Sequence, residues 1–108
     1  MVLIEMTSSF IEEVTKQVKE QKKGNRKFAD KRADNIFNLA TQMKDLGPKG
    51  KNTLIDLAKH NNPYVRLWAA STVAIFNKEF ATEVLTELAQ RPEESYGFDA
   101  QMKLDSGM

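Results

Sequence analysis

The sequence of 108 residues contains no cysteine and only one histidine, His60. Without cysteine there is no disulfide, no thiolate nucleophile and no cysteine-ligated zinc. One histidine beside two asparagines cannot supply a usual zinc site, so His60 is expected at the surface or at a helix end. No paired acid and base, metal cluster or nucleotide motif is recognisable either. We therefore expect no catalytic residue, no cofactor and no metal, and a protein that is not an enzyme.

Long apolar runs are also missing. The first six residues include only a few apolar ones, and Glu5 interrupts them. This segment is too short and too polar for the apolar region of a signal peptide. No run approaches the roughly 20 apolar residues that span a bilayer. With 41% apolar and 29% charged residues, the composition is that of a folded globular protein. We expect one domain over residues 1–108, no membrane association and a cytoplasmic location.

Apolar residues recur at helical spacing, and no segment shows the alternation of a strand. Ser9 and Glu12 fit a capping box, which predicts that the first helix begins at Ser9. Asn62 followed by Pro63 is the clearest start signal, because proline suits the first helical position. The prediction is an all-α fold of about six short helices in three antiparallel pairs. The expected helices cover residues 9–24, 26–46, 50–60, 63–77, 78–90 and 95–105.

The same spacing predicts which side chains are buried. Trp68, on a nearly continuous apolar helix, is expected in the core rather than at a cofactor site. On the second helix the expected core residues are Phe28, Ala29, Ala33, Ile36, Phe37, Ala40 and Met43. On the last helix they are Tyr96, Phe98, Ala100, Met102 and Leu104.

An internal repeat links the second half of the chain to itself. A shift of 31 residues superimposes Leu54 on Leu85, Leu57 on Leu88, Ala58 on Ala89, Val65 on Tyr96, Ala69 on Ala100 and Val73 on Leu104. Such recurrence over two helices is typical of stacked helix pairs, in which each pair covers the apolar face of its neighbour.

The segment 62–70, with its Val65-Arg66 pair and closely spaced alanines, resembles the second helix of a HEAT repeat. Residues 81–88 and 97–104 are similar to the end of a small bacterial HEAT-like family of unknown function. The resemblance implies a HEAT-like α-α superhelix without a catalytic motif. It also implies that Arg66 connects neighbouring units by hydrogen bonds, for which its planar guanidinium group with several donors is suited.

Acidic charge gathers on the fifth helix, where Glu79, Glu83 and Glu87 follow one another at i, i+4 spacing. This stripe is either a solvated face or a docking surface for a basic partner. Because helical stacks present extended surfaces, the leading hypothesis is a non-catalytic protein–protein interaction module, of a regulatory-adaptor or toxin-immunity type. An end pair without a polar cap also leaves association with a second copy open.

Basic charge gathers in residues 16–32, which could follow a phosphate backbone. Nucleic-acid binding is therefore the alternative function. Two observations weigh against it: acidic residues lie within helical reach of the basic ones, and Phe28 and Phe37 are expected in the core, where neither can stack on a base. The candidate residues for this alternative are Lys16, Lys19, Lys23, Arg26 and Lys27.

Overall fold

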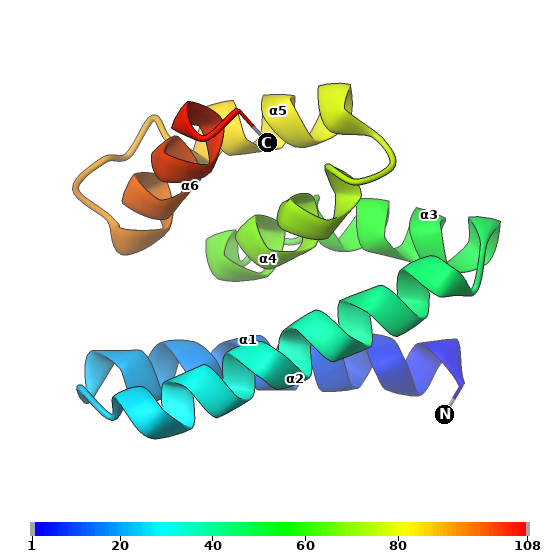
Figure 1. Cartoon of the computed structure of the whole chain (residues 1–108), viewed down its shortest axis with the longest axis horizontal. Coiled ribbons are helices and arrows are strands. Elements are labelled where there is room, and N and C mark those ends of the chain that lie inside the picture. The colour runs from blue at the N-terminus through cyan, green and yellow to red at the C-terminus, as the bar shows by residue number, and fades with distance from the viewer. Residues whose placement is uncertain (1, 108) are drawn as a thin grey trace. The chain divides into compact units, whose positions relative to one another are not determined.

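The computed structural model describes residues 2–107, in which six helices follow one another and no strand occurs (Figure 1). The predicted all-α fold of about six helices is confirmed. The helices are α1 (Leu3–Lys22), α2 (Arg26–Asp45), α3 (Pro48–Leu57), α4 (Pro63–Val73), α5 (Lys78–Leu88) and α6 (Ser95–Asp105). Within these residues, none of the helices combines the length and the apolarity that crossing a membrane requires.

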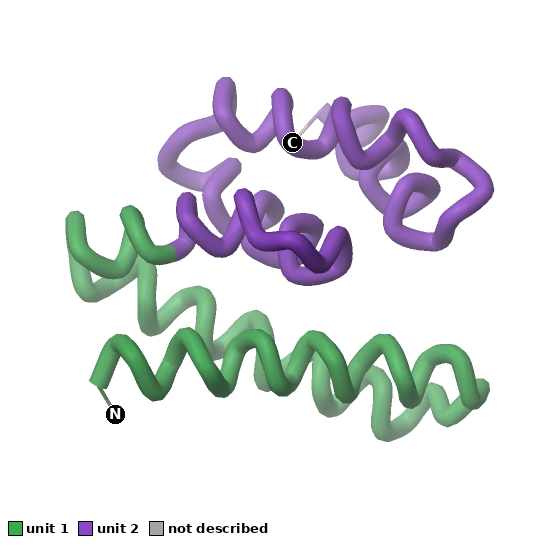
Figure 2. The backbone as a smooth tube through the Cα atoms, turned by 180° about the vertical axis from the view of Figure 1, so that it is seen from behind, with its two compact units in different colours: residues 1–53 green, residues 54–108 purple. Residues whose placement is uncertain are grey.

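The packing divides the chain into two compact units, Met1–Thr53 and Leu54–Met108, with the boundary inside α3 (Figure 2). Unit 1 holds α1, α2 and the start of α3. Unit 2 holds the end of α3 with α4, α5 and α6. The expectation of a single domain over residues 1–108 stays a prediction.

In unit 1, α1 and α2 form a hairpin of two long helices that lie side by side in both views (Figures 1 and 2). Arg32 of α2 forms an ion pair with Glu13 of α1, with Nη1 and Oε1 3.1 Å apart. Asn35 Nδ2 donates to the other oxygen of the same carboxylate at 3.4 Å. The buried side chains are Met6, Phe10, Val14 and Gln17 from α1 and Ala29, Ile36, Ala40 and Met43 from α2.

The predicted start of the first helix at Ser9 is wrong, because α1 already begins at Leu3. Met6 is buried four residues before Phe10, so the apolar stripe continues one turn on the N-terminal side of Ser9. Packing of this extra turn outweighs the local capping signal, and no side chain caps α1 at Val2.

The predicted burial of Phe28 and Phe37 is also wrong, because their exposed fractions are 52% and 62%. The buried residues of α2 form a narrow stripe whose middle lies near Ile36. At 3.6 residues per turn, Phe28 and Phe37 stand about a quarter turn away from this stripe, on opposite sides of it. Each phenylalanine therefore lies on one flank of the helix, beyond the reach of the packing.

In unit 2, α5 packs against both α4 and α6, and α4 also contacts α6. The repeat of 31 residues is visible in the core, since Leu54 and Leu85 are both buried, and so are Leu57 and Leu88. Ala69 and Ala100 are fully buried as well.

On α6 the predicted core is partly wrong, because Phe98 and Met102 are exposed. The predicted burial of Ala100 is confirmed, and Gly97, which is not among the expected core residues, is buried on the same side of the helix. Phe98 and Met102 are more than a quarter turn from that side. Trp68 is half-buried rather than enclosed in the core.

Close approach of backbones explains the burial of Gly97, the third residue of α6. A Cβ atom there would overlap the carbonyl group of Arg91 and would lie 3.0 Å from the carbonyl oxygen of Leu88. Gly50, the third residue of α3, has the same relation to the carbonyl group of Met43 in unit 1. Glycine thus lets the first turn of α3 lie directly against the end of α2, and the first turn of α6 against the turn that follows α5.

Candidate functional site

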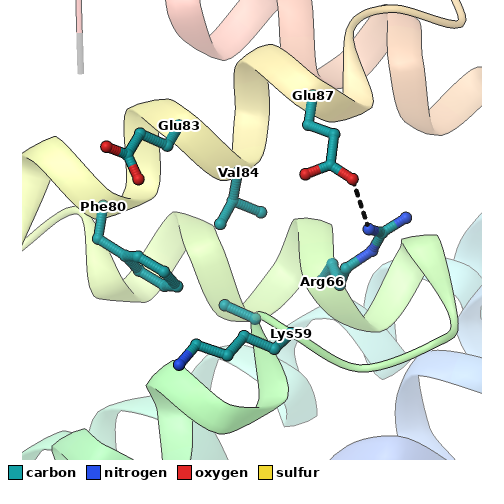
Figure 3. A pocket seen from close by; sticks show the side chains of 7 residues that line it. Lys59, Arg66, Phe80, Glu83, Val84 and Glu87 are labelled. Atoms are coloured by element: carbon teal, nitrogen blue, oxygen red, sulfur yellow. Dashed lines mark hydrogen bonds and ion pairs between the residues drawn. The ribbon is translucent and has the colours of Figure 1, made fainter.

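An open hollow of about 280 Å³ lies within unit 2 (Figure 3). Three segments line it: the two residues after α3, the second turn of α4, and the exposed side of α5. The lining residues are Ala58, Lys59, Arg66, Phe80, Glu83, Val84 and Glu87.

Helix caps fix the segments that carry these side chains. Asn62 Oδ1 accepts a hydrogen bond from the backbone N–H of Tyr64 at 2.9 Å, and Pro63 is the first residue of α4. His60 Nδ1 accepts from the backbone N–H of Asn62 at 3.0 Å, which ties the turn before the helix. Arg66 therefore projects from the second turn of a helix whose start is held by side-chain hydrogen bonds.

The start of α5 is held in the same way. Asn77 Oδ1 accepts a hydrogen bond from the backbone N–H of Phe80 at 3.2 Å. This cap places Phe80 in the first turn, with Glu83 and Val84 one turn further along. One capped helix thus supplies four of the side chains around the hollow.

Arg66 and Glu87 face each other across the hollow, as Figure 3 shows. Arg66 Nη1 donates to Glu87 Oε1 at 3.3 Å. The carboxylate side chain is 73% exposed, so this pair contributes only about 0–1 kcal/mol to stability. Arg66 Nε is buried and has no hydrogen-bond partner within residues 2–107. The guanidinium group is thus only partly satisfied by the protein.

The other end of the hollow combines a cation with an aromatic ring. Lys59 Nζ lies 5.7 Å from the centre of the Phe80 ring, within the range of a cation–π interaction. Val84 adds aliphatic surface between Phe80 and Glu87 (Figure 3). The site therefore has an apolar floor, basic groups on one side and acidic groups on the other.

The acidic stripe, Glu79, Glu83 and Glu87, lies fully on the exposed side of α5. Glu79 and Glu83 form no ion pair in the part of the chain that the structure describes. Only Glu87 is paired, and its partner Arg66 comes from another helix rather than from α5. The stripe thus keeps two carboxylates without an ion pair, and one of them, Glu83, lines the hollow.

The basic candidates of residues 16–32 all belong to unit 1. Lys16 forms an ion pair with Glu12 at 2.9 Å; the hydrogen bond from Lys16 and its charge lower the pKa of Glu12 below its ordinary value. The sequence predicts that nearby acidic residues pair with many of the basic ones, and a second ion pair of this segment is that of Arg32 with Glu13. The remaining candidates are exposed and form no ion pair within residues 2–107: Lys19, Lys23, Arg26 and Lys27.

A second hollow, of about 490 Å³, lies beside the turn between α1 and α2. Arg26 and Asp30 line it together with Gln21, Gly24 and Ala29. The described residues contain no group of three or more histidine, cysteine, aspartate or glutamate side chains that could hold a metal ion.

Lys59, Phe80 and Val84 are site residues that sequence reasoning did not single out. Lys59 follows the third helix and Phe80 begins the fifth, so no local pattern connects them. Arg66 and Glu87 were each noted, for bracing and for docking, but 21 residues separate them and their pairing has no sequence signal.

Comparison with known proteins identifies the fold. A sequence model of HEAT repeats matches residues 25–101, whereas none of the curated proteins matches the chain. The crystal structure of the protein RPA1889 from Rhodopseudomonas palustris CGA009 is similar, with a TM-score of 0.87 and 20% sequence identity. The similarity covers 97% of this chain and 87% of that one, and at this identity it shows a shared fold. The match over most of the chain confirms the resemblance seen in the sequence: the chain belongs to the HEAT repeat family.

Proposed function

We propose that this chain is a non-catalytic interaction module that binds a basic segment of a partner protein at the acidic stripe and the adjoining hollow of unit 2. HEAT repeats often mediate protein interactions, which supports the general class. The observation that carries the specific proposal is the hollow itself, which brings an apolar floor next to exposed carboxylates of α5.

Charge complementarity argues for a basic partner. Glu79, Glu83 and Glu87 repel one another at i, i+4 spacing, which costs a few tenths of a kcal/mol for each pair. A lysine or arginine side chain from a partner relieves this repulsion and gains an ion pair. Exposed charges of this kind mainly speed the encounter and select the partner.

The apolar floor supplies the short-range part of recognition. Phe80 and Val84 line the hollow from α5, and Ala58 lines it from the end of the α3 segment. An aliphatic or aromatic side chain beside the partner's basic residue can cover these groups. Burial of apolar surface there stabilises the complex by about 25 cal/mol for each Å² removed from water.

The pair of Arg66 and Glu87 does not block such binding. Its nitrogen and oxygen are 3.3 Å apart and its carboxylate is largely in solvent, so a cation from a partner replaces Arg66 at little cost. Once released from Glu87, Arg66 has its terminal nitrogens available for a carbonyl or carboxylate of the same partner segment. A regulatory adaptor and a toxin-immunity protein both fit this description.

The test begins with a photo-crosslinking amino acid at Thr86, an exposed position of α5 between Glu83 and Glu87. Crosslinking in the native cell identifies the partner, and calorimetry then gives its affinity for purified variants. We expect Glu83→Lys to weaken binding about tenfold or more, because it reverses an uncompensated charge beside the hollow.

Glu5→Lys is the matched control, since it makes the same charge change at an exposed position of unit 1. It should leave the affinity within about twofold of the original. Undiminished binding to Glu83→Lys, or equal losses in both variants, would remove the acidic stripe from the interface.

A further inference from the structure

The turn between α1 and α2 carries the densest positive charge in unit 1. Five basic side chains around it are exposed and form no ion pair within the described residues: Lys19, Lys23, Arg26, Lys27 and Lys31. Glu20 and Asp30 are the acidic residues within the stretch 19–31. The cluster therefore keeps an excess of positive charge that the protein itself does not neutralise.

An aromatic side chain lies within this cluster. Phe28, in the first turn of α2, has about half of its surface exposed. Lys27 precedes it directly, and Lys31 lies one turn further along the helix. Arg32, four residues after Phe28 and so on the same side of α2, forms an ion pair with Glu13 of α1 and is not part of the unpaired cluster. The sequence predicts a buried Phe28, which argues against base stacking. Because the ring is exposed, this argument against nucleic-acid binding no longer holds.

We propose that this basic tip, formed by Lys19, Lys23, Arg26, Lys27, Phe28 and Lys31, binds single-stranded nucleic acid. The lysine and arginine side chains contact phosphates, and one unpaired base stacks on the Phe28 ring. Surfaces that bind single strands combine these two elements, a positive track for the backbone and an aromatic face for bases.

The exposed ring of Phe28 favours single-stranded nucleic acid over duplexes and lipid bilayers as the ligand of the basic tip. Bases of a duplex are stacked on one another, so an aromatic ring at the protein surface has no free base face to cover. A lipid bilayer is also disfavoured, because stable insertion needs a broad apolar face, and the tip presents one apolar side chain. Stacking requires only one ring for each base.

The test measures fluorescence anisotropy of labelled oligothymidine and oligouridine of about 12 nucleotides, a length within the usual site size. Phe28→Ala should weaken binding about tenfold, because one stacking contact is lost. Phe28→Tyr, which keeps an aromatic face, should bind within about threefold of the original protein.

Phe37→Ala is the matched control, because Phe37 is also an exposed phenylalanine, lies on the opposite flank of the same helix and stands outside the basic cluster. It should bind like the original protein. Both phenylalanines have at least half of their surface exposed, so circular dichroism should show unchanged helix content for all three variants.

Salt provides a second readout. Each phosphate contact to a single strand lowers the logarithm of the affinity by about 0.7 for each tenfold rise in salt. Three contacts thus predict a loss of about 20-fold between 50 and 200 mM salt. The double variant Lys27→Glu, Lys31→Glu should reduce this slope by about 1.4 if both residues contact phosphates.

Two results would overturn the proposal. One is no binding of either oligonucleotide at 50 mM salt, including the case in which the protein instead binds vesicles of phosphatidylserine and phosphatidylcholine. The other is equal affinity of Phe28→Ala and Phe37→Ala, which would reduce the tip to a general attraction for polyanions. Neither result bears on the acidic stripe, whose test uses a protein partner and different variants.

Discussion

The substitution Gly97→Ala tests whether close packing in unit 2 outweighs the helix propensity of alanine. Gly97 lies inside α6, where replacement of glycine by alanine ordinarily stabilises a helix by about 1 kcal/mol. Here the added methyl group would overlap the backbone carbonyl of Arg91 and crowd that of Leu88. Backbone atoms cannot rotate aside as a flexible side chain can, so α6 must shift away from the turn that follows α5. Overpacking of this kind costs about 1–3 kcal/mol and at times more.

The net expectation for Gly97→Ala is a loss of about 0–2 kcal/mol of unfolding free energy after the gain in propensity is subtracted. Urea denaturation followed by the fluorescence of Trp68 measures this loss, because Trp68 is the one tryptophan and lies in the same unit. Gln101→Ala introduces alanine at an exposed position of α6 and removes only the exposed hydrogen bond from Gln101 Nε2 to Asp105 Oδ1, so it should change stability by a few tenths of a kcal/mol at most. A higher urea midpoint for Gly97→Ala than for the original protein would show that α6 has room for the methyl group.

Two further predictions concern charged groups of unit 2. A double-mutant cycle of Arg66→Ala and Glu87→Ala should give a coupling of about 0–1 kcal/mol that falls in 1 M salt, because the carboxylate is largely exposed; a coupling above about 2 kcal/mol would contradict this account. Burial raises the pKa of Asp99 against the opposing attraction of Lys103, so the native protein binds its proton more tightly than the unfolded chain does. The contribution of Asp99 to stability therefore falls as the pH rises through the ordinary pKa range of an aspartate. We expect the difference in melting temperature between Asp99→Asn and the original protein to be more positive at pH 7 than near pH 3. A variant effect of the same size at both pH values would refute it.

The helical architecture was predictable because it depends on repeated local signals. Leucine and alanine recur with a shift of 31 residues, and the recurring residues Leu54, Leu85, Ala69 and Ala100 are buried. Such periodicity reports the side of a helix that packs, and many residues contribute to it. A single error at a helix end, such as the predicted start at Ser9, does not change the predicted all-α architecture.

The edges of each apolar stripe were not predictable in the same way. Phe28, Phe37, Phe98 and Met102 all fit a broad apolar face, yet all four are exposed. The width of the face that a neighbouring helix covers depends on how closely the backbones approach, and small residues such as Gly97 set that distance in α6. An aromatic residue at the margin of a stripe is therefore ambiguous in a sequence, and it is at this margin that the candidate stacking residue lies.

The hollow of unit 2 was not predictable because its parts are distant in sequence. Lys59 meets Phe80 and Arg66 meets Glu87 only after α4 and α5 have packed on each other. The acidic stripe was visible as a spacing of four residues, whereas its basic and apolar neighbours were not. Local patterns identify a charged face, and tertiary packing decides which groups stand opposite to it.

The separation of charge along the chain has a consequence for recognition. A formal net charge of +1 gives the protein almost no long-range attraction for ligands of either sign. Recognition at either proposed surface therefore depends on the charges of that surface, which are screened beyond about 8 Å at physiological salt. The basic tip keeps its excess because few acids accompany it, and the acidic stripe keeps its excess because Glu79 and Glu83 form no ion pair within residues 2–107. If both surfaces were merely solvated, nothing would disfavour mixing the two signs along each helix, which would also strengthen each helix by pairs at i, i+4.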